Sequence, residues 1–431
     1  MQFSAFGHKF TRNSGILQLM DDLGKALHSD RPVNMLGGGN PARLEAVNRV
    51  YREVLQDLVH NEAAVESIGN YSTPQGDARF IDTLAAFFRH EYGWDIGPEN
   101  IALTNGSQNA FFYLFNLFGG RFGSGEDAVD KNILLPLAPE YIGYADAHVE
   151  GCHFTAVRPA IEAVEHEGEA GFFKYRVDFD ALAQLPELKA GRIGAICCSR
   201  PTNPTGNVLT DAEMAQLDAL AQAHGIPLII DNAYGMPFPN IIYSPATLTW
   251  HDNIILCFSL SKIGLPGVRT GIVVAAPEVV NAIGALNAIV NLAPTRFGAA
   301  VATPLLADGR LKILADEVVQ PFYRQQAKRA VQLLKQELAG YPMHIHKPEG
   351  AIFLWVWFEG LPVSSQTLYE RLKAAGTLVI PGEHFFIGLD TADYPHASEC
   401  IRISIAQDDT TLQNGIAAIG AAVRAAYDAA R

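Results

Sequence analysis

Residues 254–269 read IILCFSLSKIGLPGVR, a continuous apolar run followed at once by hydroxyl and cationic side chains. A short continuous apolar run is typical of a strand that is covered on both faces of a sheet. The segment after the run carries Ser259, Ser261, Lys262 and Arg269, with glycine and proline between them. This cluster indicates an anion-binding loop beside a lysine, and a solvated surface loop is the alternative.

The same rhythm of apolar runs extends through the middle of the chain. A clear helical pattern at 212–224 lies between two of the runs; Thr210 and Glu213 form a capping box before it, and Gly225 follows as a stop. This alternation predicts an α/β fold with a mostly parallel, mixed sheet sandwiched by helices. The further predicted strands are 101–103, 133–135, 195–198, 228–230 and 272–275.

The alternation of short apolar runs and helical patterns ends after Pro294. A long helical pattern covers 311–338, and Pro321 should kink it or mark a join. We therefore expect a large domain at 61–310 and a smaller C-terminal α+β domain at 311–431, which begins with this long linking helix. The N-terminal segment of the chain, 1–60, should pack with the smaller domain. Strands are expected in the smaller domain at 351–358, 378–380 and 401–405. The N-terminal pattern predicts a helix at 16–27, a short strand at 33–36, a helix at 44–58 and a loop at 61–76.

Composition excludes several classes of function. The chain has 431 residues, 48% hydrophobic and 18% charged, which is typical of a globular protein rather than a disordered one. Its net charge of −14 disfavours binding to nucleic acid or to an anionic membrane surface. Five cysteines do not describe a disulfide framework, and the start of the chain lacks the apolar core of a signal peptide, so we expect a cytoplasmic protein. The thirteen histidines show no metal-ligand spacing, and no metal is expected.

Three other polar segments follow predicted strands. Residues 105–110, NGSQNA, open a helix whose free backbone N–H groups suit a phosphate, although a plain cap by Ser107 would also explain them. Residues 199–206, SRPTNPTG, force a turn at the edge of the sheet where open α/β folds bind ligands, or are simply a turn. Asp231 ends a buried strand and needs a donor or a cation, unless it only caps a loop.

The glycine-rich segment 37–42, GGGNPA, matches a dinucleotide-binding pattern. Such a unit needs a second strand after its helix, and 61–76 reads as a loop instead. We therefore interpret this segment as a tight turn.

Taken together, these segments supply a phosphate cradle, an amide, a carboxylate, a phenol and a lysine at successive strand ends, which are the groups that a pyridoxal phosphate (PLP) site requires. As a set, N-P-T-G at 203–206, D-x-A-Y at 231–234 and S-x-S-K at 259–262 followed by Arg269 closely resemble the fold-type I, aspartate-aminotransferase-like family of PLP-dependent enzymes. The resemblance covers essentially the full length and includes FSAFGHKFTRNSGI at 3–16, LAPEYIGYADA at 137–147 and HKPEGAIFLWVWF at 346–358.

The resemblance implies a role for each matching residue. Lys262 would carry PLP as a Schiff base, Asp231 would keep the pyridine nitrogen protonated, and Tyr234 with Asn203 would bond the phenolic oxygen of the ring. Tyr141 would stack on the ring. Tyr71 would reach the phosphate of a neighbouring subunit's cofactor, which implies a homodimer with its sites at the interface. The phosphate would be held by Ser107, Gln108, Ser259, Ser261 and Arg269.

On the substrate side, the resemblance implies that Arg402 clamps the α-carboxylate, with hydrogen bonds from Gly39 and Asn203. The alternative for Arg402 is a charge on the surface of a strand. The implied reaction is ping-pong transfer of the amino group of L-valine, or of a similar aliphatic amino acid, to pyruvate, giving 3-methyl-2-oxobutanoate and L-alanine. Arg296 could bind a second carboxylate but matches no motif, so dicarboxylates are not expected.

Other functions on the same fold remain open. An aminotransferase of different specificity or a PLP-dependent β-lyase would share most of these residues. A PLP-binding regulatory module is disfavoured, because the resemblance begins within the first ten residues and the net charge is −14. A catalytically inactive interaction protein is disfavoured because Lys262, Asp231 and Arg402 are all present.

Overall fold

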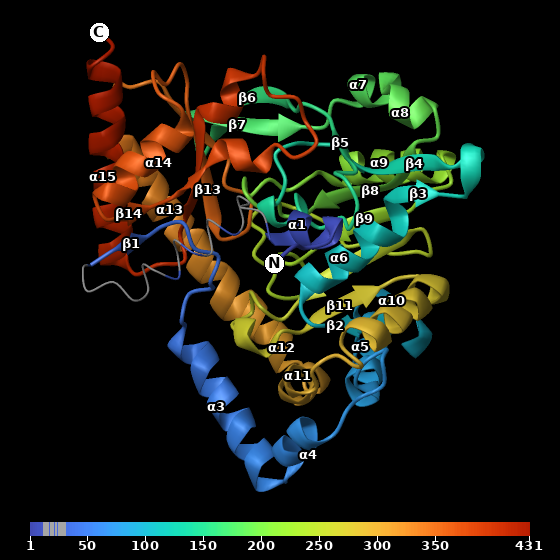
Figure 1. The fold of residues 1–431 in the computed structure, drawn as a ribbon. Coiled ribbons are helices and arrows are strands. Elements are labelled where there is room, and N and C mark those ends of the chain that lie inside the picture. Colours follow the sequence, from blue (N-terminus) through green and yellow to red (C-terminus); the bar gives the residue numbers. More distant parts are fainter. Residues whose placement is uncertain (12–16, 18–20, 22–23, 25–31) are drawn as a thin grey trace.

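The computed structural model describes residues 1–11, 17, 21, 24 and 32–431. Most of the helix expected at 16–27 lies outside the described residues. The chain forms an eight-stranded sheet, a six-stranded sheet and a short two-stranded sheet, with helices packed around them (Figure 1). Within the described residues, no helix combines the length and the apolar character needed to cross a bilayer.

The eight-stranded sheet contains the apolar runs predicted for the middle of the chain. Strands β10, β9, β8, β4 and β5 pair in parallel, whereas β11 and β3 run antiparallel to their neighbours. The predicted mostly parallel, mixed sheet is therefore confirmed. Its order is β2 (Ile101–Thr104), β11 (Gly271–Val274), β10 (Ile254–Ser259), β9 (Leu228–Asp231), β8 (Ile193–Ser199), β4 (Val129–Leu135) and β3 (Gly120–Phe122), with β5 (Phe154–Ala156) paired to β4.

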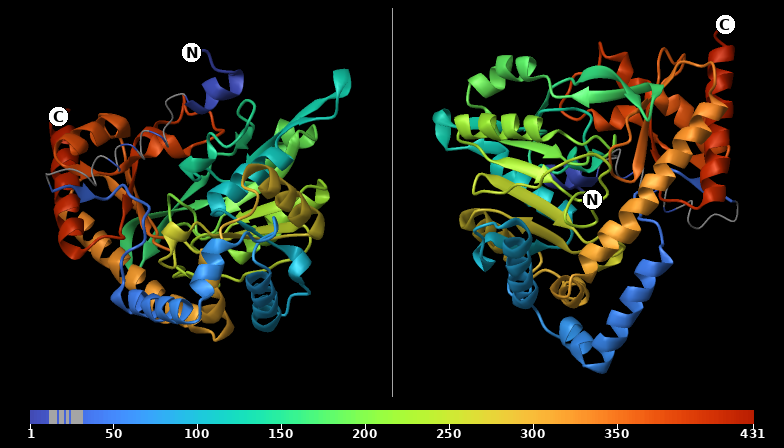
Figure 2. Two further views of the ribbon diagram at one scale, coloured as in Figure 1. Left: turned by 60° about the horizontal axis from the view of Figure 1, so that its bottom comes forward. Right: turned by 180° about the vertical axis from the view of Figure 1, so that it is seen from behind.

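Helices cover both faces of this sheet. Helix α6 (Ser107–Phe118) crosses in front of the strands in Figure 1, and α9 (Asp211–Ala223) comes forward when the molecule is seen from behind (Figure 2). This covering explains why the strands read as continuous apolar runs. Further helices around the sheet are α5 (Ala78–Tyr92), α7 (Phe179–Gln184), α8 (Pro186–Lys189), α10 (Pro277–Val290) and α11 (Phe297–Ala307).

The register of three parallel strands decides where the polar segments meet. Ser199, the last residue of β8, lies beside Asp231, the last residue of β9, and Asp231 in turn lies beside Cys257 of β10. The loops that follow these strands therefore start side by side at one edge of the sheet. This edge is where open α/β sheets bind ligands.

The six-stranded sheet combines the C-terminal part of the chain with a hairpin from its middle. β6 and β7 precede β8 in sequence, yet β7 pairs in parallel with β12 of the C-terminal part. The strands of the two large sheets therefore do not fall into two consecutive stretches of sequence that separate at residue 310. The order is β15 (Ile380–Pro381), β16 (Cys400–Ser404), β13 (Phe353–Phe358), β12 (Met343–His346), β7 (Glu169–Arg176) and β6 (Ala160–His166). Around it pack α13 (Gln320–Glu337), α14 (Ser365–Ala374) and α15 (Asp409–Asp428).

The N-terminal segment joins this second half of the molecule through β1 (Asn34–Met35), which pairs in parallel with β14 (Thr377–Leu378). The strand predicted at 33–36 and the helix predicted at 44–58, now α3 (Glu45–His60), are both present. Helix α1 (Ala5–Thr11) precedes them.

One local prediction needs correction. The loop expected at 61–76 contains α4 (Ala63–Gly69), because its alanines and glutamate have high helix propensity. Next to Pro321, where a kink or a join is predicted, the helix changes type: α12 (Arg310–Ile313) widens into a π-helical stretch, Leu314–Val319, before α13 continues. Proline has no N–H to donate to the preceding turn, and the π-helical stretch accommodates that loss within a continuous helix.

The capping box of α9 gives a stability prediction. Thr210 Oγ1 accepts a hydrogen bond from the backbone N–H of Glu213 at 3.2 Å, and Glu213 Oε2 accepts one from the backbone N–H of Thr210 at 2.8 Å. Thr210→Ala should lower the free energy of unfolding by about 1 kcal/mol in a urea titration followed by circular dichroism. Gln216→Ala, on the exposed face of the same helix, is the control and should change it by less than about 0.5 kcal/mol. An equal effect of the two substitutions would contradict the role of the cap.

Candidate active site

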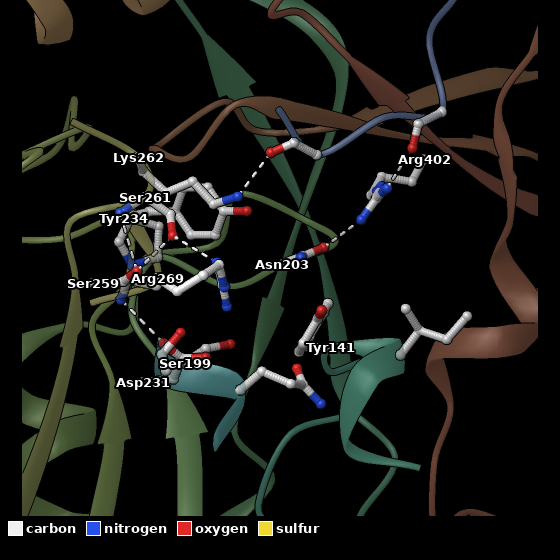
Figure 3. Close-up of a pocket in the computed structure, with 17 residues that line it drawn as sticks. Tyr141, Ser199, Asn203, Asp231, Tyr234, Ser259, Ser261, Lys262, Arg269 and Arg402 are labelled. Atoms are coloured by element: carbon white, nitrogen blue, oxygen red, sulfur yellow. Dashed lines mark hydrogen bonds between the residues drawn. The ribbon is translucent and has the colours of Figure 1, made fainter. Parts of the chain in front are cut away.

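A cavity of about 190 Å³ lies at the carboxyl ends of β8, β9 and β10, where the loops of the eight-stranded sheet meet residues of the six-stranded one (Figure 3). Every predicted site residue except Tyr71 lines it. Tyr71 lies on the surface with 81% of its area exposed. The predicted residues in the lining are Gly39, Ser107, Gln108, Tyr141, Asn203, Asp231, Tyr234, Ser259, Ser261, Lys262, Arg269 and Arg402.

Lys262 is the buried amine of the cavity. Its Nζ donates a hydrogen bond to the carbonyl oxygen of Gly39 at 2.7 Å and lies 5.4 Å from the centre of the Tyr234 ring. Burial, together with the positive charges of Arg402 and Arg269, lowers the pKa of Lys262 to about 8, against the opposing effect of Asp231. A lysine with this pKa can give up its proton near neutral pH, as a nucleophile or a base must.

Asp231 is the carboxylate of the cavity. Its Oδ2 accepts a hydrogen bond from the hydroxyl of Tyr144 at 2.6 Å, and its Oδ1 accepts one from the backbone N–H of Ala233 at 3.0 Å. Burial raises the pKa of Asp231, while both hydrogen bonds and the charge of Lys262 oppose that rise. These donors fix the orientation of the carboxylate and favour its charged form.

The polar edge beside Lys262 is built to hold an anion. Ser259 Oγ donates to Ser261 Oγ at 2.9 Å, and Arg269 Nη1 lies 3.5 Å from the same Ser261 oxygen. Gly106 has φ +89°, and a Cβ there would come within 2.2 Å of Arg269 Nη2. Gly106 is the N-cap of α6 and Ser107 its first residue, so the alternative of a plain Ser107 cap is wrong. The helix start leaves backbone N–H groups facing the guanidinium side of the cavity.

Arg402 enters the cavity from β16 of the other sheet. Its Nη1 donates to Asn203 Oδ1 and its Nη2 to the carbonyl oxygen of Gly37, both at 2.8 Å. The guanidinium lies 4.1 Å from the centre of the Phe353 ring, and its Nε has no hydrogen-bond partner. Only 2% of Arg402 is exposed, so a strand-surface charge is excluded. Burial lowers the pKa of Arg402 to about 10, and it remains a cation at neutral pH.

Arg402 lacks a counter-ion. No carboxylate of the described residues forms an ion pair with it. A buried cation without an acid partner is costly, so the site favours a ligand that brings a carboxylate. Arg296, in contrast, pairs with Asp77 at 3.1 Å and does not line the cavity.

Sequence reasoning missed several residues of this site. The carboxyl group of Glu140 accepts hydrogen bonds from the backbone N–H of Ser199 at 2.8 Å and from its hydroxyl at 2.5 Å, and burial raises the pKa of Glu140 to about 8. Tyr144, which holds Asp231, was also missed. Both residues belong to the segment at 137–147, where only Tyr141 had been assigned. Their contacts depend on the fold, because only the parallel register brings β8 and β9 to them. Five residues that line the cavity were missed as well: Gly37, Ile142, Ser199, Pro201 and Ala233.

The sequence profile of the family described as aminotransferase class I and II matches residues 34–419. The chain belongs to this family. The prediction of a fold-type I aminotransferase is thereby confirmed, and the chain is a transaminase. In the segment 37–42, the carbonyl oxygens of Gly37 and Gly39 accept hydrogen bonds from Arg402 and Lys262 in the aminotransferase cavity.

Individual aminotransferases resemble the whole chain. The valine–pyruvate aminotransferase of Escherichia coli (strain K12) is 47% identical over 427 residues, which cover 99% of each chain. The crystal structure of valine–pyruvate aminotransferase from Salmonella typhimurium LT2 aligns with a TM-score of 0.86 at 45% identity and covers 96% of this chain and 100% of its own. A protein of Psychrobacter arcticum 273-4, provisionally assigned as an amino-acid aminotransferase, aligns with a TM-score of 0.98 at 65% identity over 99% of each chain.

Aminotransferases of this family use pyridoxal 5′-phosphate. The donor set of the cavity fits that group: an amine of lowered pKa, an oriented buried carboxylate, and an anion cradle of hydroxyls, helix N–H groups and a guanidinium. Two features indicate a cavity shaped for anionic ligands: the unpartnered Nε of Arg402, and the glycine at 106, which lets the Arg269 guanidinium approach the start of α6.

The charges around Lys262 give a pH prediction. In PLP-free protein, labelling of Lys262 by an amine-reactive reagent, followed by mass spectrometry of its peptide, should be half-maximal at pH about 8, because only the neutral amine reacts. Arg402→Met should move this midpoint to higher pH, since it removes a positive charge that lowers the pKa. Arg296→Met, a cation outside the cavity, is the control. A wild-type midpoint above pH 10 would contradict the assignment of Lys262 as a perturbed amine.

Proposed function

We propose that this aminotransferase moves the amino group of L-valine, or of a similar aliphatic amino acid, to pyruvate, and releases 3-methyl-2-oxobutanoate and L-alanine. The observation that carries the proposal is the buried Arg402, which has no carboxylate partner among the described residues and lies in the same cavity as Lys262. A guanidinium in this setting matches the one carboxylate that every amino and 2-oxo acid presents. The likeness to valine–pyruvate aminotransferases over nearly the full length supports the choice of substrates.

The rest of the lining supports a monocarboxylic, aliphatic substrate. The cavity's cations are Lys262, Arg269 and Arg402, and none is left for a second carboxylate once the cofactor phosphate takes Arg269. Arg296 is engaged by Asp77 and Glu66. Ile142 presents an apolar side chain in the lining and is itself 3% exposed, which suits a branched aliphatic group.

The cofactor would be held by the residues that the resemblance assigned to it. Arg269, Ser107, Gln108, Ser259 and Ser261 would bind the phosphate, where the N-terminus of α6 adds its dipole. Asp231 would keep the ring nitrogen protonated. Tyr234 and Asn203 would bond the phenolic oxygen, and Tyr141 would stack on the ring. When bound, pyridoxal phosphate supplies an aldehyde that bonds to amines and a protonated ring that withdraws electrons from the substrate's Cα.

The chain's own groups then move the proton. Arg402 and Asn203 would orient the substrate through its carboxylate, and Gly39 would add a hydrogen bond, so that the Cα–H bond faces Lys262. Lys262 Nζ, as the neutral amine, would take the proton from Cα and return it to the cofactor side. Its pKa of about 8 matches this exchange in both directions near neutral pH.

We further propose a cytoplasmic homodimer. Its support is a band of exposed apolar side chains at α4 and at the end of α10, with Ile289 82% and Ile68 73% exposed. The two segments adjoin, since Ser72 donates a hydrogen bond to the carbonyl oxygen of Pro294. Tyr71 lies in this band and would reach the partner's phosphate. All five cysteines are free, as suits a reducing compartment.

The domain division also stays a proposal. We place the large PLP-binding domain at 61–310 and the smaller one at 311–431, with 1–60 packed against the latter. The pairing of β1 with β14 supports this arrangement. The hairpin β6–β7 is an exception, because it adds to the sheet of the smaller domain.

A spectroscopic titration tests the reaction. PLP-loaded protein should lose its lysine-bound PLP absorbance on addition of L-valine and regain it on addition of pyruvate, which shows both half-reactions. L-aspartate should convert the cofactor much less. If L-valine fails while another amino acid converts the cofactor, the valine assignment is wrong and an aminotransferase remains. If no amino acid converts it, a β-lyase or a regulatory module replaces the proposal. Lys262→Ala should lack the lysine-bound band from the start.

The dimer gives a further prediction. Tyr71→Phe should raise the dissociation constant of PLP roughly ten- to hundredfold, since a hydrogen bond to a charged phosphate is worth about 1.5–3 kcal/mol. Dialysis followed by absorbance measures the loss of cofactor, and sedimentation should show that the dimer persists. Tyr341→Phe, whose phenol bonds Asp428 at the surface, is the matched control. Unchanged PLP affinity in Tyr71→Phe would remove Tyr71 from the cofactor site.

A further inference from the structure

A buried ion pair joins Lys174 of β7 to Glu349, in the turn between β12 and β13. The two side chains are 3% and 5% exposed, and neither lines the cavity. Burial lowers the pKa of Lys174, while the charge of Glu349 opposes that shift. The cost of removing two charges from water largely offsets their attraction, so stability alone is a weak explanation for the pair.

The pair forms hydrogen bonds with the loop that connects β8 to α9, residues 199–209. Lys174 Nζ donates to Asn207 Oδ1 and to the carbonyl oxygen of Val208, both at 2.9 Å, as well as to Glu349 Oε2. Glu349 Oε2 also accepts the backbone N–H of Val208 at 3.2 Å. Both backbone polar groups of Val208 are therefore held by the pair, and the three N–H donors of the ammonium each have an acceptor.

Further hydrogen bonds connect these contacts to the part of the cavity that contains Arg402. The carbonyl oxygen of Asn207 accepts the backbone N–H of Thr202 at 2.8 Å, and the carbonyl oxygen of Thr202 accepts the backbone N–H of Gly206 at 2.8 Å. The next residue, Asn203, accepts the guanidinium of Arg402 at 2.8 Å. The ion pair is thus connected to the contact between Asn203 and Arg402 through the fold of one loop.

The backbone of this loop packs closely against the turn that carries Glu349. Gly206 has φ +71°, and a Cβ there would lie 2.6 Å from the carbonyl oxygen of Gly350. A Cβ on Gly350 would lie 2.6 Å from Cγ of Pro201. Gly350 directly follows Glu349, so a displacement of the carboxylate's turn is transmitted to the loop.

We infer that Lys174 and Glu349 are positioning residues for the substrate carboxylate: they act through the 199–209 loop to hold Asn203 against Arg402. The inference rests on the proposed function of Arg402 and extends it to two residues outside the cavity. It couples the six-stranded sheet, which carries Lys174 and Arg402, to the loop that carries Asn203. Loss of the pair should weaken carboxylate binding and leave the chemistry at Lys262 nearly unchanged.

The test removes both charges together. Lys174→Met/Glu349→Met avoids an unpaired buried charge and is compared with the wild type, both loaded with PLP. The probe is 3-methylbutanoate, which has the carbon skeleton of valine without its amine and cannot react. Its dissociation constant, from calorimetry, should rise about tenfold in the double variant. The KM for L-valine should rise by a similar factor while kcat falls less than threefold, as expected when a binding contact common to ground and transition states is lost.

A second variant and a control complete the design. Glu349→Gln keeps the shape of the side chain and tests the inference if the double variant does not fold. The dissociation constant of this variant for 3-methylbutanoate should rise about threefold. Lys335→Met/Glu169→Gln removes a surface ion pair at the other end of β7 and should leave binding unchanged. Unchanged affinity for 3-methylbutanoate in both Glu349 variants would overturn the inference. A wild type that binds 3-methylbutanoate but does not convert L-valine would contradict the proposed function, while the affinities would still test the pair.

Discussion

The parallel register of β8, β9 and β10 is the constraint on which the site depends. β8 and β9 end level with each other and β10 runs two residues further in the same direction, so the polar residues that follow the three strands share one edge of the sheet. That edge receives Ser199 from the first strand, Asp231 from the second, and Ser259 with Lys262 from the third. Antiparallel neighbours would have sent these side chains to opposite ends of the sheet. The chemistry of the cavity is thus a consequence of how the core packs.

Charge is the second organising principle. Lys262, Arg269 and Arg402 line a cavity together with one carboxyl group, Asp231, which the hydroxyl of Tyr144 holds in place. Burial and, after it, repulsion from Arg402 and Arg269 lower the pKa of Lys262. Anionic ligands relieve this repulsion, whereas a neutral molecule leaves it intact. Selection for phosphate and carboxylate groups is therefore built into the unliganded protein.

The sequence predicted the strand ends, because continuous apolar runs and turn residues are local signals. It also supplied twelve of the seventeen residues that line the cavity, although Tyr141 and Gly39 were assigned only through family resemblance. It did not reveal Glu140 or Tyr144, whose importance lies in partners that are distant in sequence, Ser199 and Asp231. Family resemblance alone predicted that Arg402 binds the substrate carboxylate. The alternation of apolar and polar residues in β16 would also fit a charge on the surface of a strand. Pairing of β7 with β12 is likewise a tertiary choice that no local pattern encodes.

The interleaved hairpin β6–β7 has a consequence for the way this chain is made. Its partner strand β12 lies more than 150 residues downstream. During synthesis on the ribosome, one edge of β7 therefore has no partner strand until the helices and strands between β7 and β12 have been made. An exposed edge of this kind is a template for intermolecular pairing. Charged residues along β6 and β7, among them Glu162, Glu165, Glu169 and Lys174, are of the kind that disfavours such intermolecular pairing.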